Sequence, residues 1–282
     1  MANRPIPPLT NAALWALVAI YAFARLLQLF PAPLLLLVVL HVFPPLLFAL
    51  LHGALAYRVR GILLFTALSF LTGNVFENLS ILTGFPFGHY YFSGVMGPKL
   101  FLVPVTLGLA YLGIGYLAFV LGRLLVCGPV APVSGGRVLA VPLVAAFAMV
   151  AWDVAMEPVW STLLHCWIWR GGGVYFGAPL TNFFGWFLTV YIIYQLFALY
   201  LSRQPGTPCL PRTYWRIAVL YYALCAAGNL LVALPAPSAA VVTDPAGVPW
   251  HVSAITRACA LASLAGMGSF VLLAARKLRS SW

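Results

Sequence analysis

The sequence predicts an all-α protein, a polytopic transmembrane helical bundle of about eight spans with both termini in the cytoplasm. Of the 282 residues, 63% are hydrophobic and 7% are charged, and the mean hydropathy is +1.01. So few polar side chains cannot coat a soluble globule, and apolar runs of about 20 residues recur along the chain. These runs lack the alternation of a membrane β-barrel. We therefore expect residues 1–282 to form one helical domain in the cell membrane.

The individual spans follow from the apolar runs and the polar residues between them. We expect them at about residues 12–30, 34–56, 61–82, 100–126, 138–165, 183–202, 213–234 and 252–275. The first span follows a short, weakly charged segment without a clear cleavage site, so we interpret it as a retained helix and not as a signal peptide.

The basic residues support this count and set the orientation. With eight spans, 11 of the 15 Lys and Arg residues fall on one side of the membrane, which the positive-inside rule assigns to the cytoplasm. The other four are Arg25, Lys99, Arg170 and Arg257. The net charge of +11 is thus a topology signal and an attraction to anionic membrane lipids, and it forms no recognisable nucleic-acid-binding module. The sequence does not predict an oligomeric state.

Three of the chain's four carboxylates, Glu77, Asp153 and Glu157, lie inside predicted spans. An ionisable group at bilayer depth is costly unless it is paired or hydrated, and it is a candidate functional group by default. A helix rises about 1.5 Å per residue, which places Glu77 roughly 24 Å, Asp153 roughly 22 Å and Glu157 roughly 28 Å along their spans from the cytoplasmic side. The three carboxylates are therefore expected in one layer, in the outer half of the bilayer.

Asp153 and Glu157 are four residues apart and so occupy the same face of a helix. Two close carboxyl groups in a low dielectric do not both ionise easily, which leaves a protonated acid beside a carboxylate. Such a pair can act as a general acid and a general base in catalysis. The alternative is structural: the two groups could bond to Asn182, to tryptophan N–H groups or to arginine and only fix helix packing.

Two connections on the non-cytoplasmic side are rich in glycine and aromatic residues. They read GFPFGHYYFSGVMGPK from Gly84 to Lys99 and WIWRGGGVYFGAPLTNFFGW from Trp167 to Trp186. Such loops suit a backbone folded closely against a flat, apolar ligand, although interfacial aromatic belts have a similar composition. The candidate substrate-binding residues are Phe85, Phe87, His89, Tyr90, Trp152, Tyr175, Asn182, Phe183 and Trp186.

Several other chemistries lack the residues that they need. The five histidines form no HxxxH or HExxH pair and the five cysteines no metal-ligand spacing, so no metal site is predicted and the cysteines are interpreted as small buried residues. Prenyl transfer requires aspartate-rich clusters for magnesium and diphosphate, and no nucleotide-binding glycine pattern is present. No cofactor is predicted.

Three segments resemble one known family. They are FENLSILTGFPFGHYYFSGVMGPKLFLVP (Phe76 to Pro104), MVAWDVAMEPVWS (Met149 to Ser161) and the Trp167 to Trp186 loop. They are similar to the signature regions of carotenoid biosynthesis membrane proteins of the bisanhydrobacterioruberin hydratase or CruF type, over about residues 60–202. The resemblance implies a cofactor-independent hydro-lyase that adds water across the terminal double bond of an acyclic carotenoid end group.

The resemblance also marks particular positions. They are Glu77, the run from Gly84 to Tyr90, Asp153, Glu157, Pro158, Tyr175, Asn182 and Trp186. The chain departs from the family's D-x-x-x-D-P pattern at Glu157, where an aspartate is expected and the carboxyl group reaches one methylene further.

The residue chemistry is compatible with that reaction. A neutral carboxylic acid protonates one alkene carbon, and a carboxylate orients the water that captures the tertiary cation. We expect Asp153 to be the acid and either Glu157 or Glu77 to orient the water, with the faces of Trp152, Tyr175, Phe183 and Trp186 stabilising the cation. Two alternatives remain: a carotenoid- or lipid-binding or proton-coupled transporter, and a cofactor-free carotenoid cyclase or isomerase.

Overall fold

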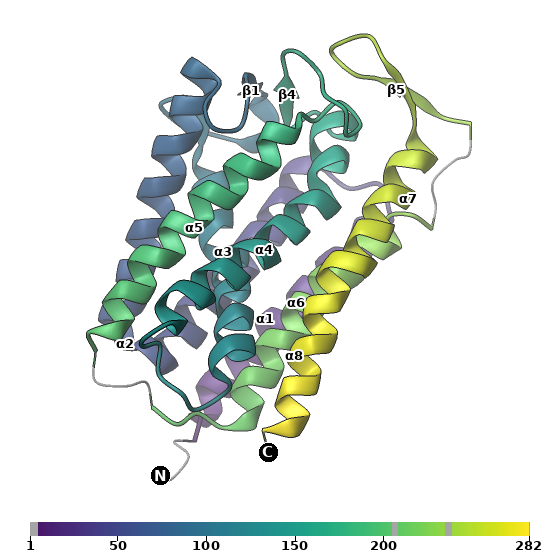
Figure 1. Ribbon diagram of the computed structural model, residues 1–282. Coiled ribbons are helices and arrows are strands. Elements are labelled where there is room, and N and C mark those ends of the chain that lie inside the picture. The colour runs from purple at the N-terminus through teal and green to yellow at the C-terminus, as the bar shows by residue number, and fades with distance from the viewer. Residues whose placement is uncertain (1–4, 205–207, 235–238, 282) are drawn as a thin grey trace.

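The computed structural model describes residues 5–204, 208–234 and 239–281, and it confirms the predicted all-α membrane bundle (Figure 1). The helices are α1 Pro8–Leu27, α2 Leu34–Thr83, α3 Val105–Cys127, α4 Arg137–Pro158, α5 Leu180–Ser202, α6 Arg212–Leu231, α7 Val252–Ala262 and α8 Gly268–Ser280. One π-helical segment, η2 (Val159–Leu163), extends α4, and another, η3 (Ser263–Met267), joins α7 to α8. Each predicted span coincides with helix to within a few residues.

The long helix α2 consists of two helical halves. Arg58 has φ 57° and ψ 173°, which are not helical angles, and the chain reverses there. A Cβ atom on Gly53 would overlap the Ile62 side chain, although nine residues of straight helix would separate the two by about 14 Å. The reversal lies between the predicted spans 34–56 and 61–82.

Six helices among the described residues are long and apolar enough to cross a membrane, and α2 is one of them. The predicted span 213–234, which forms α6, is not in that set.

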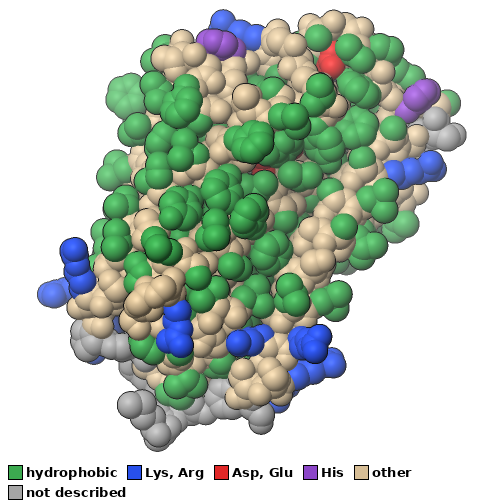
Figure 2. Space-filling view, in the orientation of Figure 1, with side chains coloured by type: hydrophobic (Ala, Val, Ile, Leu, Met, Phe, Trp, Pro, Cys, Tyr) green, Lys and Arg blue, Asp and Glu red, His purple; other side chains and the backbone are tan. Residues whose placement is uncertain are grey.

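The described ends of the chain lie at the same end of the bundle (Figure 1). Lys and Arg side chains gather at that end, below a broad hydrophobic belt (Figure 2). The count of eight spans and the cytoplasmic position of the termini stay predictions.

Short strands form at the other end of the bundle. β1 (Tyr90–Phe92) pairs antiparallel with β4 (Trp167–Trp169), with Tyr90 opposite Trp169. The strands belong to the two glycine-rich aromatic connections, which the pairing therefore brings together. The connection between α2 and α3 also contains the 3₁₀ turn η1 (Gly94–Met96) and the antiparallel pair β2 (Lys99–Leu100) and β3 (Val103–Pro104). A third antiparallel pair, β5 (Val241–Thr243) and β6 (Pro249–His251), precedes α7.

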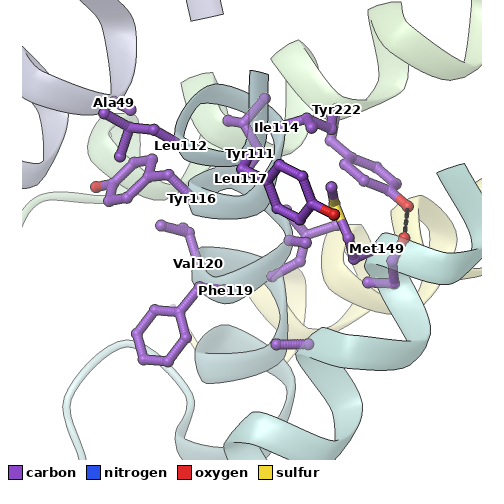
Figure 3. Close-up of a cluster of buried hydrophobic side chains, with 14 of the residues drawn as sticks. Ala49, Tyr111, Leu112, Ile114, Tyr116, Leu117, Phe119, Val120, Met149 and Tyr222 are labelled. Carbon is purple, nitrogen blue, oxygen red and sulfur yellow. Dashed lines mark hydrogen bonds between the residues drawn. The ribbon is translucent and has the colours of Figure 1, made fainter. Parts of the chain in front are cut away.

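Helix α3 forms the centre of the bundle and is the most deeply buried of the long helices. Its side chains pack against α2, α4 and α6, and Figure 3 shows Tyr111, Leu117 and Met149 in this core. In the same region the Tyr222 hydroxyl donates a 2.6 Å hydrogen bond to the Ala148 carbonyl oxygen, which ties α6 to α4. Four of the five cysteines, Cys127, Cys166, Cys225 and Cys259, are buried free thiols.

The α3–α4 contact yields a stability prediction. A Cβ atom on Gly122 would lie 2.8 Å from the backbone nitrogen of Ala145, whereas Gly136, at the start of α4, has open space around it. We expect Gly122→Val to lower the free energy of unfolding by about 1–3 kcal/mol through overpacking. Thermal unfolding in detergent measures this effect, with Gly136→Val as the control. Equal melting temperatures for the two variants would contradict the close approach of α3 and α4.

Candidate active site

The three carboxyl groups predicted to share one layer lie together in a buried cluster beside the β1–β4 pair. Glu77 comes from the second half of α2, and Asp153 and Glu157 come from the last two turns of α4. Glu77 is 4% exposed, and the other two are fully buried. The groups are close enough for their charges to interact, so the energy of ionising one depends on the state of the others.

Two indole N–H groups hold Glu157. Its Oε1 atom accepts hydrogen bonds from Nε1 of Trp167 at 2.8 Å and from Nε1 of Trp169 at 2.7 Å. The two tryptophans are two residues apart on β4, so both point to the same face of the strand. The other oxygen, Oε2, is buried and has no hydrogen-bond partner among the described residues.

Two tyrosine hydroxyls hold Glu77. Tyr111 of α3 donates to Oε1 at 2.6 Å, and Tyr90 of β1 donates to Oε2. Burial, together with the neighbouring Glu77 carboxylate, raises the pKa of Tyr90 well above its usual range, so Tyr90 stays a phenol and donates its proton. The ring of Tyr90 also packs against Trp169, with 4.7 Å between ring centroids, which connects the Glu77 and Glu157 environments.

Within the described part of the chain, the Asp153 carboxyl group has one hydrogen-bond partner. Its Oδ2 atom accepts a 2.9 Å hydrogen bond from Nδ2 of Asn182 on α5, and its buried Oδ1 atom has no partner among the described residues. One turn after Asn182, the indole of Trp186 stacks on Tyr111 with centroids 4.4 Å apart and meets Trp152 edge to face at 6.2 Å. Helix α5 thus places an amide on Asp153 and an aromatic surface beside it.

Two cavities adjoin the cluster. The smaller one, about 20 Å³, is lined by Glu77, Glu157 and Asn182 together with aromatic side chains. A buried site needs roughly 10–15 Å³ to hold one water molecule, so this cavity has room for one. The larger one, about 70 Å³, is mainly apolar and shares Trp167 and Trp186 with the smaller. Water beside Glu77 and Glu157 and an apolar group beyond the two shared indoles can therefore occupy neighbouring spaces, whereas Asp153 lines neither cavity.

The structure brings some predicted substrate-binding residues to this cluster and places others elsewhere. Phe87, Tyr90, Asn182 and Trp186 line the smaller cavity, and Trp152 lines the larger one. Outside both cavities lie Phe85 and His89, which are exposed, and Tyr175 and Phe183, which pack on each other beside α4.

Sequence reasoning omitted three residues that contact the carboxyl groups: Tyr111, Trp167 and Trp169. The two tryptophans alternate with Ile168, and this period of two is a strand signal that predicts a shared face. Tyr111 lies in a uniformly apolar helix, where no local pattern distinguishes it from the other core aromatics.

The two indole bonds predict how Glu157 variants behave. Glu157→Gln keeps a carbonyl oxygen for both N–H groups, whereas Glu157→Leu leaves two buried donors unpaired, at about 1–3 kcal/mol each. We expect the leucine variant to unfold at a clearly lower temperature than the glutamine variant in detergent, with a change in tryptophan fluorescence. Equal stability of the two variants would show that the indoles do not depend on Glu157.

Comparison with known proteins identifies the family. The family model described as carotenoid biosynthesis protein matches residues 31–247, which extends beyond the resembling region of residues 60–202 in both directions. The matched range includes Glu77, Asp153, Glu157 and both aromatic connections. No curated protein and no solved structure matches the chain. Because the match covers more than half of the sequence, the chain belongs to the carotenoid biosynthesis protein family.

Proposed function

We propose that this protein is a carotenoid hydratase that adds water across the terminal double bond of an acyclic carotenoid end group without a cofactor. The observation that carries the proposal is the arrangement of Asp153 and Glu157. Both side chains are fully buried, and each has one bonded oxygen and one oxygen without a partner among the described residues. A water-sized cavity lies beside Glu157, and an apolar cavity shares Trp167 and Trp186 with it. The family assignment supports a role in carotenoid biosynthesis.

The first step is proton transfer to carbon. With Asp153 protonated on Oδ1, the proton passes to the less substituted alkene carbon, the π electrons form the new C–H bond, and a tertiary cation and a carboxylate result. The hydrogen bond from Asn182 to Oδ2 leaves Oδ1 available and stabilises the charge that develops on the carboxylate.

The second step is capture of the cation by water. A water molecule in the small cavity lies against Glu157 and Glu77, whose oxygens accept its protons and direct its lone pair towards the cation. Glu157 has Oε2 unbonded for this purpose, whereas both oxygens of Glu77 already accept tyrosine hydroxyls. Addition of the water oxygen and loss of one proton to a carboxylate give the tertiary alcohol, with no change in oxidation state overall.

Aromatic faces stabilise the intermediate. Trp152, Trp167 and Trp186 line the larger cavity, and a cation near the face of an indole ring is attracted by its quadrupole. The same rings exclude bulk water, so the single bound water captures the cation before other nucleophiles reach it.

Expression in a host that accumulates lycopene tests the activity directly. We expect pigments heavier by one or two water molecules, and we expect Asp153→Asn, which keeps the bond with Asn182 but cannot supply the proton, to remove them while the protein still folds. Mass analysis of extracted pigments is the measurement. A fully active Asp153→Asn protein would exclude this mechanism. An unchanged mass with an altered spectrum would indicate a cyclase or isomerase, and no change of pigment would favour binding or transport.

The role of Glu77 is tested with a matched pair of tyrosines. Tyr111→Phe removes a hydroxyl that donates to Glu77, and Tyr194→Phe removes an equally buried hydroxyl that donates to the Gly115 carbonyl, away from the cluster. Hydrogen bonds to charged groups contribute about 1.5–3 kcal/mol, so we expect the hydration rate to fall about 10- to 100-fold for Tyr111→Phe and to change little for Tyr194→Phe. Equal rates for the two variants would exclude Glu77 from the reaction.

A further inference from the structure

A second polar cluster lies in the membrane region, separate from the carboxyl groups. Arg25 of α1, His41 of α2 and Asn229 of α6 line a cavity of about 260 Å³. The same three residues also line the apolar cavity beside the carboxyl cluster, so the two spaces are neighbours. The proposed hydration assigns no role to this cluster.

Arg25 is a buried cation that pairs with no carboxylate in the described part of the chain. Its side chain is 7% exposed, and one guanidinium nitrogen donates to Asn229 Oδ1 at 2.6 Å and to the Cys225 carbonyl oxygen at 3.4 Å, while Nε is buried and has no partner among the described residues. The chain's four carboxylates are bonded to other groups: three in the active-site cluster and Asp244 to Trp250. A buried guanidinium in the membrane is costly unless an anion or several acceptors surround it.

The backbone makes room for this arginine. A Cβ atom on Gly228 would overlap the Arg25 guanidinium, so the absence of a side chain at Gly228 is what allows Arg25 to lie across α6. The neighbouring Gln28 amide donates to the Gly228 carbonyl oxygen at 2.8 Å. The arginine is thus held in place and is not a mobile side chain extended towards water.

His41 supplies an acceptor in the same cavity. Its Nδ1 atom lies 2.7 Å from the Leu37 carbonyl oxygen, which can only accept, so Nδ1 carries the proton. In the neutral ring Nε2 is then an acceptor, and it is buried and unbonded. Arg25 is near enough to act on His41 electrostatically. A ligand that satisfies both residues therefore combines an anionic acceptor for Arg25 with a donor for His41.

The position of the cluster indicates the source of that ligand. Arg25 and Asn229 each lie two residues before the end of their helix, and Thr256, on the cavity wall, lies four residues after the start of α7. Arg25 is about 26 Å along α1 from Pro8, near the far edge of a hydrocarbon core about 30 Å thick. The headgroup layer with the lipid phosphates begins just beyond that edge.

We propose that this cavity binds the phosphoglycerol headgroup of an anionic membrane lipid, with the phosphate accepting from Arg25 and a glycerol hydroxyl donating to His41. The cavity, of about 260 Å³, is far larger than the roughly 10–15 Å³ that one water molecule needs, which leaves room for a group of this size. The acyl chains extend into the surrounding bilayer. The proposal does not depend on the hydratase activity.

Native mass spectrometry of the full chain in maltoside detergent tests the site. We expect the wild-type protein to retain phosphatidylglycerol and Arg25→Gln to bind it at least about tenfold more weakly, because a charge-assisted bond is lost. The control is Arg257→Gln, which removes an exposed arginine of α7 and should leave binding unchanged. Gly228→Ala, which displaces the guanidinium but keeps its charge, should weaken binding as well. Unchanged lipid retention in both Arg25→Gln and Gly228→Ala would overturn the proposal.

The His41 contact is tested with a second lipid. Phosphatidylmethanol has the same anionic phosphodiester but no free hydroxyl, so the wild-type protein should prefer phosphatidylglycerol, and His41→Phe should lose that preference. Equal binding of the two lipids by the wild-type protein would remove His41 from the site. Displacement of retained lipid by low millimolar inorganic phosphate would identify free phosphate as the ligand and contradict the assignment to a lipid.

Discussion

The need to satisfy buried carboxyl groups in an apolar bundle governs the structure around the site. Glu77, Asp153 and Glu157 lie where no solvent can solvate them, and an unsatisfied ionisable group there costs several kcal/mol. The donors come mostly from outside the carboxylates' own helices: the β1–β4 pair supplies Tyr90 and two indoles, and α3 and α5 supply one group each. Pairing of the two aromatic connections thus supports the burial of Glu77 and Glu157, and α5 supports that of Asp153.

This constraint explains why the fold was predictable from sequence and the full site was not. Apolar runs of about 20 residues determine the helices directly, and a local break at Arg58 separates two spans as the polar residues there predict. Asp153 and Glu157 stand out because charge is rare in such runs. Tyr111 does not, because a tyrosine in an apolar helix is ordinary, and only the packing of α3 against α2 makes it a partner of Glu77. The burial of Phe87 and the exposure of Phe85, two residues apart, depend on the tertiary path of their loop.

The structural and catalytic interpretations of the acidic pair are compatible. Asn182 and the two indoles do bond to Asp153 and Glu157, as a purely structural role requires. A structural role alone, however, would be served best by saturating every oxygen, since each unpaired buried acceptor is destabilising. Among the described residues Asp153 Oδ1 and Glu157 Oε2 stay unbonded, and a cavity with room for a water lies beside Glu157. Retained unsatisfied groups of this kind concentrate at functional sites.

The difference between the three carboxyl groups also separates their tasks. Glu77 accepts from two phenols, one on each oxygen, whereas Asp153 and Glu157 each keep one oxygen without a partner among the described residues. Ionisation of any one of the three makes ionisation of the others costlier, which favours retention of a proton on Asp153 or Glu157, whose unbonded oxygens can carry it. In the hydration that we propose, the proton that reaches the alkene therefore comes from the pair with the unbonded oxygens, and Glu77 acts on the bound water and on the charge of its neighbours.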